Sequence, residues 1–323
     1  MSIDEAATGE ERDRRSLTGK EPLTPPTISA AAHLAGCLLC NSFQSQLLFR
    51  TTRPILRCLE CGLVFAEPRS KTTHDDYSED YYRDGVYADY LADREAIQRN
   101  APRALAELEA MVEGRKLLDV GCATGFFLDA ARRRGWDVRG LELSQYASDY
   151  ARRELNLAVE TASITAPPQQ LPRFDAITLW DTIEHLERPD IALQNIRQLL
   201  NPRGILVFST GDYGSVLRRV TGKRWRLFAD PTHNFFFDER ALRRLLESAG
   251  FEVLRLTRRG KRVSLSMMLH QSGLPLSARA RSWLLKSGWN PSVYVNLRDV
   301  VTVFARPNTQ SLRKREKGGT AEG

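Results

Sequence analysis

Long apolar runs are absent from this sequence. No stretch of the 323 residues approaches the roughly 20 apolar residues of a membrane-spanning helix, and the first residues, Met1 to Glu5, contain no apolar signal core. We therefore expect a cytoplasmic protein without a transmembrane segment. Since 42% of the residues are hydrophobic, the chain can still bury one substantial core and a small additional module.

Phosphate-binding signatures are also missing from the main glycine turn, Gly121 to Gly125. The turn reads G-x-A-x-G, which differs from the G-x-G-x-x-G of dinucleotide enzymes. No G-K-[ST] follows it to hold a triphosphate. The pattern therefore favours neither NAD nor ATP.

Cysteine is scarce, with five residues, yet four of them form two C-x-x-C pairs. Cys37 and Cys40 are followed, after 17 intervening residues, by Cys58 and Cys61. This spacing is typical of a structural four-thiolate zinc site, which leaves no coordination position open for a substrate. Two disulfides are the alternative, but the chain has no secretion signal and the cytosol keeps thiols reduced. The apolar residues between the pairs favour a module that docks on a neighbour over one that binds nucleic acid.

The stretch from Lys116 to Phe127 is an apolar run that ends in Asp119 and is followed by the glycine turn and a helix-like segment. This order predicts a buried strand, a tight turn and a helix N-terminus, whose open N–H groups favour electron-rich ligand atoms. Glu142 ends the next apolar segment, 23 positions after Asp119, about where related folds bind ribose hydroxyls. The corner therefore indicates a nucleoside ligand.

Strands and helices alternate from position 117 onward. We expect strands at 117–120, 138–141, 158–160, 175–180, 205–210 and 300–305, and helices at 124–134, 144–155 and 192–200. Short apolar strands that alternate with amphipathic helices predict right-handed crossovers and an α/β, doubly wound parallel sheet. Residues 201–204, which include Pro202 and Gly204, are expected to separate the last of these helices from the strand at 205–210.

The glycine corner resembles the class I S-adenosylmethionine-dependent methyltransferases, whose first motif is written here as LLDVGCATGFF. The resemblance implies a seven-stranded Rossmann-like sheet with an antiparallel last strand, S-adenosylmethionine as cofactor, and Glu142 as the ribose acid. It also implies Ser163 or a backbone group at the adenine. The cofactor residues that it implies are Asp119, Gly121, Cys122, Ala123, Gly125, Glu142, Leu143, Ser163, Trp180 and Asp181. Cys122 is either a reactive thiol or a small residue of the pocket wall.

A second motif, D-x-x-E-H, follows the strand at 175–180 and contains Asp181, Glu184 and His185. If the motif forms a helical turn, all three side chains converge at the mouth of the sheet. The motif resembles that of ubiquinone-type and related O-methyltransferases. Some relatives with an E-x-x-E-H version hold a divalent metal there, sometimes with a further histidine, which would be His233 here. His185 is then a general base, a metal ligand with Glu184 and His233, or a structural brace.

Five parts of the chain are expected. They are a disordered leader at 1–32, a zinc-ribbon module at 33–68, a helical lid or linker at 69–113, a methyltransferase domain at 114–306, and a disordered basic tail at 307–323. The linker is rich in tyrosine, including Tyr77, Tyr81, Tyr82, Tyr87 and Tyr90. These rings either cover the cofactor and acceptor, since ring faces attract cations, or pack beneath the linker.

Two insertions, 212–237 and 258–298, are expected to build the acceptor side. Both place basic residues near tryptophans (Trp225, Trp283 and Trp289), which either hold phosphate and stack a sugar or base, or form a solvated surface. The net charge of +7 implies an anionic partner such as a phosphorylated metabolite, nucleic acid or an acidic membrane. Residues 277–286 fit a segment that lies on an anionic membrane, near a lipid-linked acceptor.

The whole order of motifs looks like that of zinc-ribbon-bearing bacterial methyltransferases linked to cell-surface glycan or secondary-metabolite pathways. It implies O-methylation of a hydroxyl on a sugar, glycolipid or other small acceptor, with S-adenosylmethionine, structural zinc and a possible divalent metal at Glu184, His185 and His233. The alternatives are an RNA methyltransferase that uses the ribbon and basic insertions, and an inactive cofactor-binding scaffold. Peripheral membrane contact is compatible with each of these hypotheses.

Overall fold

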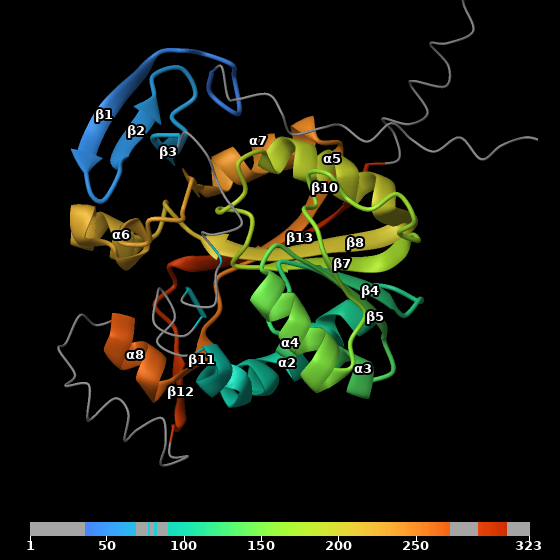
Figure 1. Cartoon of the computed structure of the whole chain (residues 1–323). Helices are drawn as coiled ribbons and strands as arrows, with labels where there is room; N and C mark the ends of the chain where they lie inside the picture. The colour runs from blue at the N-terminus through green and yellow to red at the C-terminus, as the bar shows by residue number, and fades with distance from the viewer. Residues whose placement is uncertain (1–35, 69–76, 78–80, 83–89, 272–289, 309–323) are drawn as a thin grey trace, which may run out of the picture.

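The computed structural model describes residues 36–68, 77, 81–82, 90–271 and 290–308 (Figure 1). Several predictions fall outside these ranges: the leader, nearly all of the basic tail, Tyr87, the tryptophans Trp283 and Trp289, and the membrane segment at 277–286. Among the helices within these ranges, none combines the length and the apolar character that a bilayer crossing requires.

The main sheet has seven strands in the spatial order β10-β13-β8-β7-β4-β5-β6. They are β4 (Lys116–Val120), β5 (Asp137–Glu142), β6 (Val159–Thr161), β7 (Phe174–Trp180), β8 (Leu200–Gly211), β10 (Phe251–Thr257) and β13 (Val300–Pro307). Strands β4 to β8 pair in parallel, whereas β13 runs antiparallel between β8 and β10. The predicted doubly wound sheet with an antiparallel closing strand is therefore confirmed.

Helices cover both faces of this sheet. Figure 1 shows α2 (Arg94–Glu109), α3 (Phe126–Arg133) and α4 (Gln145–Leu155) on one face, and α5 (Pro189–Leu199) and α7 (Glu239–Ser248) on the other. Each helix buries one apolar stripe. In α7, for example, the buried residues are Ala241, Leu242, Leu245 and Leu246, which recur at helical spacing. Because the strand order reverses between β4 and β7, the carboxyl ends of these strands open a crevice at the edge where such folds bind ligands.

Strand β8 differs from the prediction at its start. We expected residues 201–204 to form a separate turn, but α5 ends at Leu199 and β8 begins at Leu200. The pairing with β7 jumps from Leu200 to Ile205 while β7 advances only from Phe174 to Ala176, so the expected turn is an irregularity within the strand. The Asn201 amide, which donates to Asp175 Oδ1 over 2.7 Å, holds this irregularity against β7.

The four-cysteine segment forms a second sheet with a strand from the first insertion. Its strands β1 (Ser45–Arg50), β2 (Pro54–Cys58) and β3 (Val64–Ala66) are antiparallel, and β9 (Phe235–Phe236) completes the sheet by pairing with β3. The sheet of the four-cysteine segment thus includes a strand, β9, that begins two residues after His233. The boundary drawn at position 68 stays a prediction, and this pairing crosses it.

The two insertions add short elements around the open edge of the main sheet. The first contains α6 (Val216–Thr221) and the 3-10 turns η3 (Gly222–Arg224) and η4 (Arg226–Phe228), and the second contains β11 (Lys261–Ser264), α8 (Leu265–Gln271) and β12 (Ser292–Val295). Strands β11 and β12 form a two-stranded antiparallel sheet beside the 3-10 turn η2 (Tyr90–Asp93) and α2. Lys261 of β11 contacts Asp181 of the cavity wall, so this sheet lies near the same crevice.

Trp225 of the first insertion belongs to the core. Its side chain is 1% exposed and packs against Tyr213 and Phe228, and its Nε1 donates to Asp299 Oδ2 over 3.1 Å. Arg226, which follows it, binds the same carboxylate. The alternative that Trp225 stacks on a sugar or base is therefore wrong, because both faces of the ring are covered.

Candidate active site

The glycine turn lies between β4 and α3 and has a left-handed backbone at Gly121 (φ 70°), Ala123 (φ 48°) and Gly125 (φ 83°). A Cβ atom on Gly121 would lie 2.6 Å from Thr182 Cγ2, so only glycine fits where this turn passes the end of β7. Ala123 occupies its left-handed position although it carries a side chain. Gly121 and Ala123 both line the cavity at this corner of the sheet.

Glu142 ends β5 and is held by the turn that it faces. Its Oε2 accepts from the Ala123 N–H and its Oε1 from the Ser144 N–H, both over 2.8 Å, and the Tyr82 hydroxyl donates to Oε1 over 3.4 Å. Burial raises the pKa of this carboxyl, although the backbone N–H groups act in the opposite direction. Oε1 accepts two of these hydrogen bonds and Oε2 only one, so Oε2 keeps a lone pair for a further donor such as a hydroxyl.

Asp119 lies near the end of β4, buried behind the residues that line the cavity. Its side chain is 2% exposed and its Oδ1 accepts from the Thr178 hydroxyl over 2.6 Å. Burial, together with the nearby charge of Glu142, raises the pKa of Asp119 to about 8. It therefore supports the turn from beneath.

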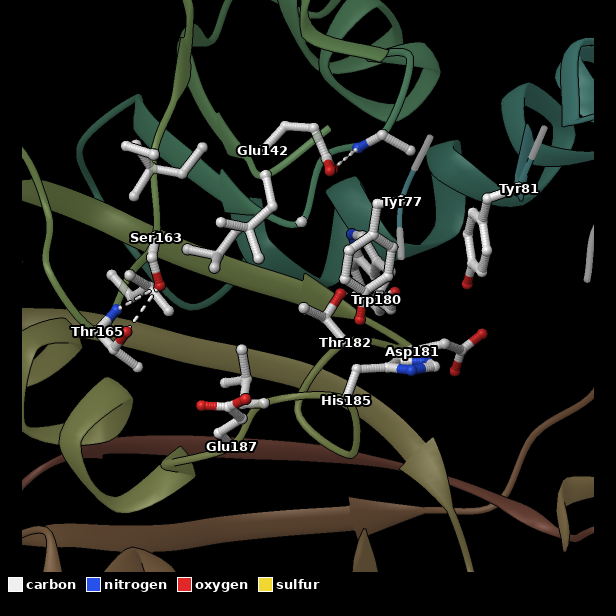
Figure 2. Close-up of a pocket in the computed structure, with 18 of the residues that line it drawn as sticks. Tyr77, Tyr81, Glu142, Ser163, Thr165, Trp180, Asp181, Thr182, His185 and Glu187 are labelled. Carbon is white, nitrogen blue, oxygen red and sulfur yellow. Dashed lines mark hydrogen bonds between the residues drawn. The ribbon is translucent and has the colours of Figure 1, made fainter. Parts of the chain in front are cut away.

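One cavity of about 260 Å³ joins this corner to the D-x-x-E-H motif (Figure 2). Seven of the residues predicted to bind the cofactor line it: Gly121, Ala123, Glu142, Leu143, Ser163, Trp180 and Asp181. The other three, Asp119, Cys122 and Gly125, are not among the described lining residues. The buried Cys122 thiol would lie 2.6 Å from a Cβ on Gly140, which is a packing position.

The cavity wall combines aromatic rings with a few polar groups. Tyr77, Tyr81, Tyr82 and Tyr90 line it on one side, which favours a role in covering bound ligands over packing away from the cavity. The indole Nε1–H of Trp180 is buried and has no hydrogen-bond partner among the described residues. A buried donor without an acceptor is costly, so this atom fits a ligand that offers one.

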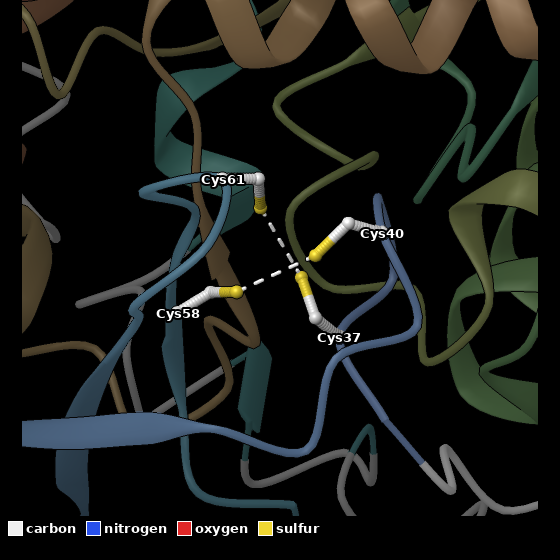
Figure 3. Close-up of side chains that lie close together, drawn as sticks. All are labelled: Cys37, Cys40, Cys58 and Cys61. Carbon is white, nitrogen blue, oxygen red and sulfur yellow. Dashed lines mark hydrogen bonds between the residues drawn. The ribbon is translucent and has the colours of Figure 1, made fainter.

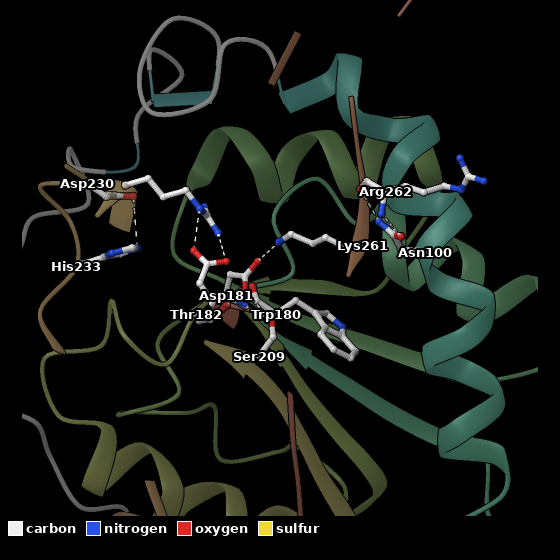
Figure 4. A network of polar contacts seen from close by, with 11 residues as sticks. Asn100, Trp180, Asp181, Thr182, Ser209, Asp230, His233, Lys261 and Arg262 are labelled. Atoms are coloured by element: carbon white, nitrogen blue, oxygen red, sulfur yellow. Dashed lines mark hydrogen bonds and ion pairs between the residues drawn. The ribbon is translucent and has the colours of Figure 1, made fainter. Parts of the chain in front are cut away.

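Asp181 does not join the other two residues of its motif. It follows β7 with φ 50°, so the motif is not helical from its first residue, and its side chain turns to the opposite insertion (Figure 4). Ser209 Oγ donates to its Oδ1 over 2.7 Å, and Lys261 Nζ lies 2.5 Å from its Oδ2. Burial raises the pKa of Asp181, but Lys261 and Ser209 outweigh burial and lower it to about 2. The expected helical turn is therefore wrong at Asp181, although Asp181 still lines the same cavity as His185.

Glu184 and His185 instead meet His233. One ligand atom from each residue lies within 4.8 Å of the others, and the two imidazole rings are 4.6 Å apart between centroids. The structure thus brings together the three residues that were named as a possible divalent metal site.

Both histidines are held in one tautomer. The Thr232 hydroxyl donates to Asp230 Oδ1 over 2.5 Å, so it must accept from His185 Nδ1, which lies 2.9 Å away. His233 Nδ1 likewise donates to the Leu227 carbonyl over 2.8 Å. The Nε2 of His185 therefore keeps its lone pair, the arrangement found in metal-binding histidines whose other nitrogen is hydrogen-bonded. The Nε2 of His233 lies 3.5 Å from Asp230 Oδ2.

The electrostatics of this cluster favour a cation. Burial and the charge of Asp181 raise the pKa of Glu184 to about 8, and its Oε2 has no hydrogen-bond partner among the described residues. Burial and the neighbouring His233 lower the pKa of His185 to about 4. A histidine with this pKa is neutral at pH 7 but is a weak general base, since catalytic bases work best near the operating pH. The two imidazole rings and an unpaired buried carboxyl oxygen are ligand types that fit a divalent metal ion.

The four cysteines of the ribbon converge as predicted (Figure 3). Their sulfur atoms lie within 4.8 Å of one another, with 3.4 Å between Cys37 and Cys61 and 3.5 Å between Cys40 and Cys58. These distances exceed the roughly 2.05 Å of a disulfide bond, and all four thiols are free. The donor set fits one tetrahedral four-thiolate ion.

Several residues of the site were not found from sequence. Asp230, Thr232 and Asn234 hold the two histidines, and Lys261 holds Asp181. The only local signal was the polar D-P-T-H-N stretch around His233. Lys261 had no signal, because its partner lies 80 positions away.

Comparisons with known proteins agree with this geometry. The family described as "Methyltransferase domain" matches residues 89–256, more than half of the chain. A ubiquinone biosynthesis O-methyltransferase of Alkalilimnicola ehrlichii is 37% identical over 105 residues, which are 31% of this chain and 42% of that protein. The protein of the same name from Coxiella burnetii is 28% identical over 162 residues, which are 47% of this chain and 69% of that protein.

Among solved structures, the magnesium protoporphyrin IX methyltransferase of Synechocystis PCC 6803 with bound SAM is 13% identical. It aligns with a TM-score of 0.46 over 74% of this chain and 100% of that one. The family match spans the sheet from β4 to β10, including the glycine turn, Glu142 and the Glu184–His185–His233 cluster. The chain therefore belongs to the methyltransferase domain family, and the predicted class of enzyme, an S-adenosylmethionine-dependent methyltransferase, is confirmed.

Proposed function

We propose that this methyltransferase moves the sulfonium methyl group of S-adenosylmethionine to a hydroxyl oxygen of a small acceptor, such as a sugar or a glycolipid. The observation that carries the proposal is the single cavity that contains Glu142 at one end and Asp181 and His185 at the other. The names of the relatives, which are O-methyltransferases, support an oxygen acceptor. The choice of a sugar or glycolipid as acceptor rests on the resemblance of the motif order to that of zinc-ribbon-bearing bacterial methyltransferases.

The cofactor would occupy the end of the cavity near the glycine turn. Glu142 would accept from a ribose hydroxyl, and Gly121 and Ala123 would lie against the ligand. Ser163, whose hydroxyl is bonded to Thr165 Oγ1 over 2.7 Å, would contact the adenine end. The unpaired Trp180 Nε1–H would donate to the carboxylate of the methionine part, which satisfies the buried donor.

The acceptor would enter from the His185 end. Its oxygen attacks the methyl carbon as the bond from that carbon to sulfur breaks, S-adenosylhomocysteine leaves, and the hydroxyl proton passes to solvent. In-line alignment of acceptor, methyl group and sulfur supplies much of the rate, on the order of 7–11 kcal/mol for well-oriented reactants. Asp181, fixed by Ser209 and Lys261, would form the wall beside the entering acceptor.

Glu184, His185 and His233 would hold a divalent metal ion, which lowers the pKa of a hydroxyl bound next to it when present. The protein's own contribution is the fixed tautomer of both histidines and an unpaired carboxyl oxygen. Cys37, Cys40, Cys58 and Cys61 would hold a structural zinc ion. The pairing of β3 with β9 supports docking on the methyltransferase domain as the function of that module. It argues against nucleic-acid binding by the module, because one edge of its sheet is already paired.

Calorimetric titration of the zinc-loaded protein with S-adenosylmethionine and S-adenosylhomocysteine tests the first part of the proposal. We expect saturable binding that Glu142→Ala weakens. Methyl transfer to hydroxylated sugars and to RNA is then compared with and without added Mg²⁺ or Mn²⁺. Transfer to RNA with a steep salt dependence would favour the nucleic-acid alternative. If the folded protein binds neither ligand even with acceptors present, the scaffold hypothesis replaces the proposal.

A further inference from the structure

Arg53 connects the four-cysteine module to the loop that carries His233. It lies just before β2, and its guanidinium is anchored on the module itself through Nε and Nη2, which donate to the Glu67 carbonyl over 3.2 and 2.5 Å. Its Nη1 points the other way. This nitrogen donates to the carbonyls of Pro231 and His233 over 3.1 and 3.2 Å, and to Asn234 Oδ1 over 3.1 Å. The Arg53 side chain therefore binds the four-cysteine module and the His233 loop at the same time.

Asn234 carries this connection into the D-x-x-E-H motif. Its side-chain Nδ2 donates to the His185 carbonyl over 2.7 Å, and its backbone N–H donates to the Glu184 carbonyl over 2.8 Å. Its own carbonyl accepts from the Ala66 N–H of β3 over 2.9 Å. Glu184, His185 and His233 are thus each connected to Arg53 through one or two hydrogen bonds.

The chemistry of this position requires an arginine. Several oxygen acceptors lie on two sides of one planar group, and a guanidinium has five N–H donors in a rigid fork that can reach them together. A lysine ammonium is a point charge on a flexible stem and would satisfy fewer of these carbonyls. Removal of the side chain leaves carbonyl oxygens of the His233 loop without their donor, so the loop loses its fixed position.

We propose that Arg53 is a positioning residue of the Glu184–His185–His233 centre, and that the four-cysteine module sets the geometry of methyl transfer through it. The inference rests on the proposed role of this centre in the reaction. It gives the module a function within the enzyme: the metal-closed ribbon is the rigid support from which the His233 loop is held. A displacement of about 1 Å at a reacting group can cost about 10²-fold in rate.

The test compares Arg53→Ala and Arg53→Lys with Arg57→Ala. Arg57 is an exposed arginine of β2 in the same module, and no hydrogen bond from it to residues 230–234 is present among the described contacts. For each variant, zinc content, hydrogen–deuterium exchange of peptides covering 229–237, affinity for S-adenosylhomocysteine, kcat and KM are measured. The exchange measurement needs no turnover, so it judges Arg53 even if the proposed function fails.

We expect Arg53→Ala to keep its zinc and to bind S-adenosylhomocysteine within about twofold of the parent protein. Exchange at 229–237 should rise at least tenfold, and kcat should fall about 10²-fold with a much smaller change in KM for the cofactor. Arg53→Lys should show an intermediate loss, and Arg57→Ala should behave as the parent. If Arg53→Ala does not fold, Arg53→Lys decides by the same criteria. Parent-like exchange in a folded Arg53 variant overturns the inference, and so does parent-like kcat in an active one.

Discussion

The two ends of the cavity are built in different ways. The centre of the cofactor end comes from neighbouring segments of the chain, since the glycine turn and Glu142 lie within 22 positions of each other and are directly hydrogen-bonded. The acceptor end draws on Arg53, the D-x-x-E-H motif, the His233 loop and Lys261, which are spread over more than 200 positions. A site made of adjacent segments keeps its geometry when remote parts are lost, whereas a site made of distant segments depends on the packing between them.

Loss of the zinc ion should separate the two ends most clearly. Dialysis against a chelator that is selective for Zn²⁺, with Mg²⁺ kept in excess, should abolish turnover because the ribbon no longer supports the His233 loop. Affinity for S-adenosylhomocysteine should change less than about threefold. Structural zinc sites contribute on the order of 10 kcal/mol to the folding of small metal domains, so the module itself should open. Re-addition of Zn²⁺ is the control and should restore turnover. Equal loss of cofactor affinity and turnover would show that the two ends are not independent.

Glu142→Gln should weaken cofactor binding and leave the acceptor end unchanged. The amide cannot accept from both backbone N–H groups and a ribose hydroxyl as a carboxylate does, so we expect affinity for S-adenosylhomocysteine to fall about 30-fold, equivalent to about 2 kcal/mol. Exchange at 229–237 should stay unchanged. Glu160→Gln, at the central residue of β6 with a half-exposed side chain, is the matched control and should bind as the parent does. Unchanged affinity in Glu142→Gln would remove Glu142 from the cofactor site.

Asp119 predicts a pH dependence at the cofactor end. Burial raises the pKa of Asp119 to about 8 in the folded protein, far above its value in the unfolded chain, so its protonated form stabilises the fold below about pH 4 and this contribution is lost as the pH rises through 8. Asp119→Asn keeps an acceptor for Thr178 and has no charge to bury. In denaturant unfolding without cofactor, the variant should gain about 4 kcal/mol over the parent between pH 5 and pH 9. An equal difference at both pH values would contradict the burial of a titrating carboxyl.

The smallest expected effect is at the rim of the acceptor end. Lys261→Met removes the ammonium beside Asp181, so the pKa of Asp181 should rise from about 2 and the wall beside the acceptor should loosen. Because Lys261 is half exposed, we expect only a three- to tenfold rise in KM for the acceptor, with cofactor affinity unchanged. Lys223→Met, at an exposed lysine of η3, is the control. A rise in cofactor KM instead would place Lys261 at the wrong end of the cavity.

The difference between the ends also explains what could be predicted from sequence. Strand and helix alternation gave the sheet, and the turn and Glu142 were found because their spacing along the chain is fixed by one βαβ unit. The helical turn expected at Asp181 was wrong because its left-handed backbone and its partner Lys261 depend on tertiary packing, which local spacing does not contain. Trp225 was misjudged for the same reason, since its partner Asp299 lies 74 positions away. Glu184, His185 and His233 were named together only because the resemblance supplied the third residue.

The pairing of β3 with β9 has a consequence for biosynthesis. Ala66 ends β3 and Phe235 begins β9, so 169 positions separate the two edges that must meet. At ribosomal rates of about 5–20 residues per second, the ribbon strands emerge on the order of 10 s or more before their last partner strand. The cysteines can capture their metal during this interval, but the edge of β3 stays unpaired until the His233 loop has been synthesised. Completion of the ribbon sheet is therefore a late event on the ribosome, although its first three strands are made early.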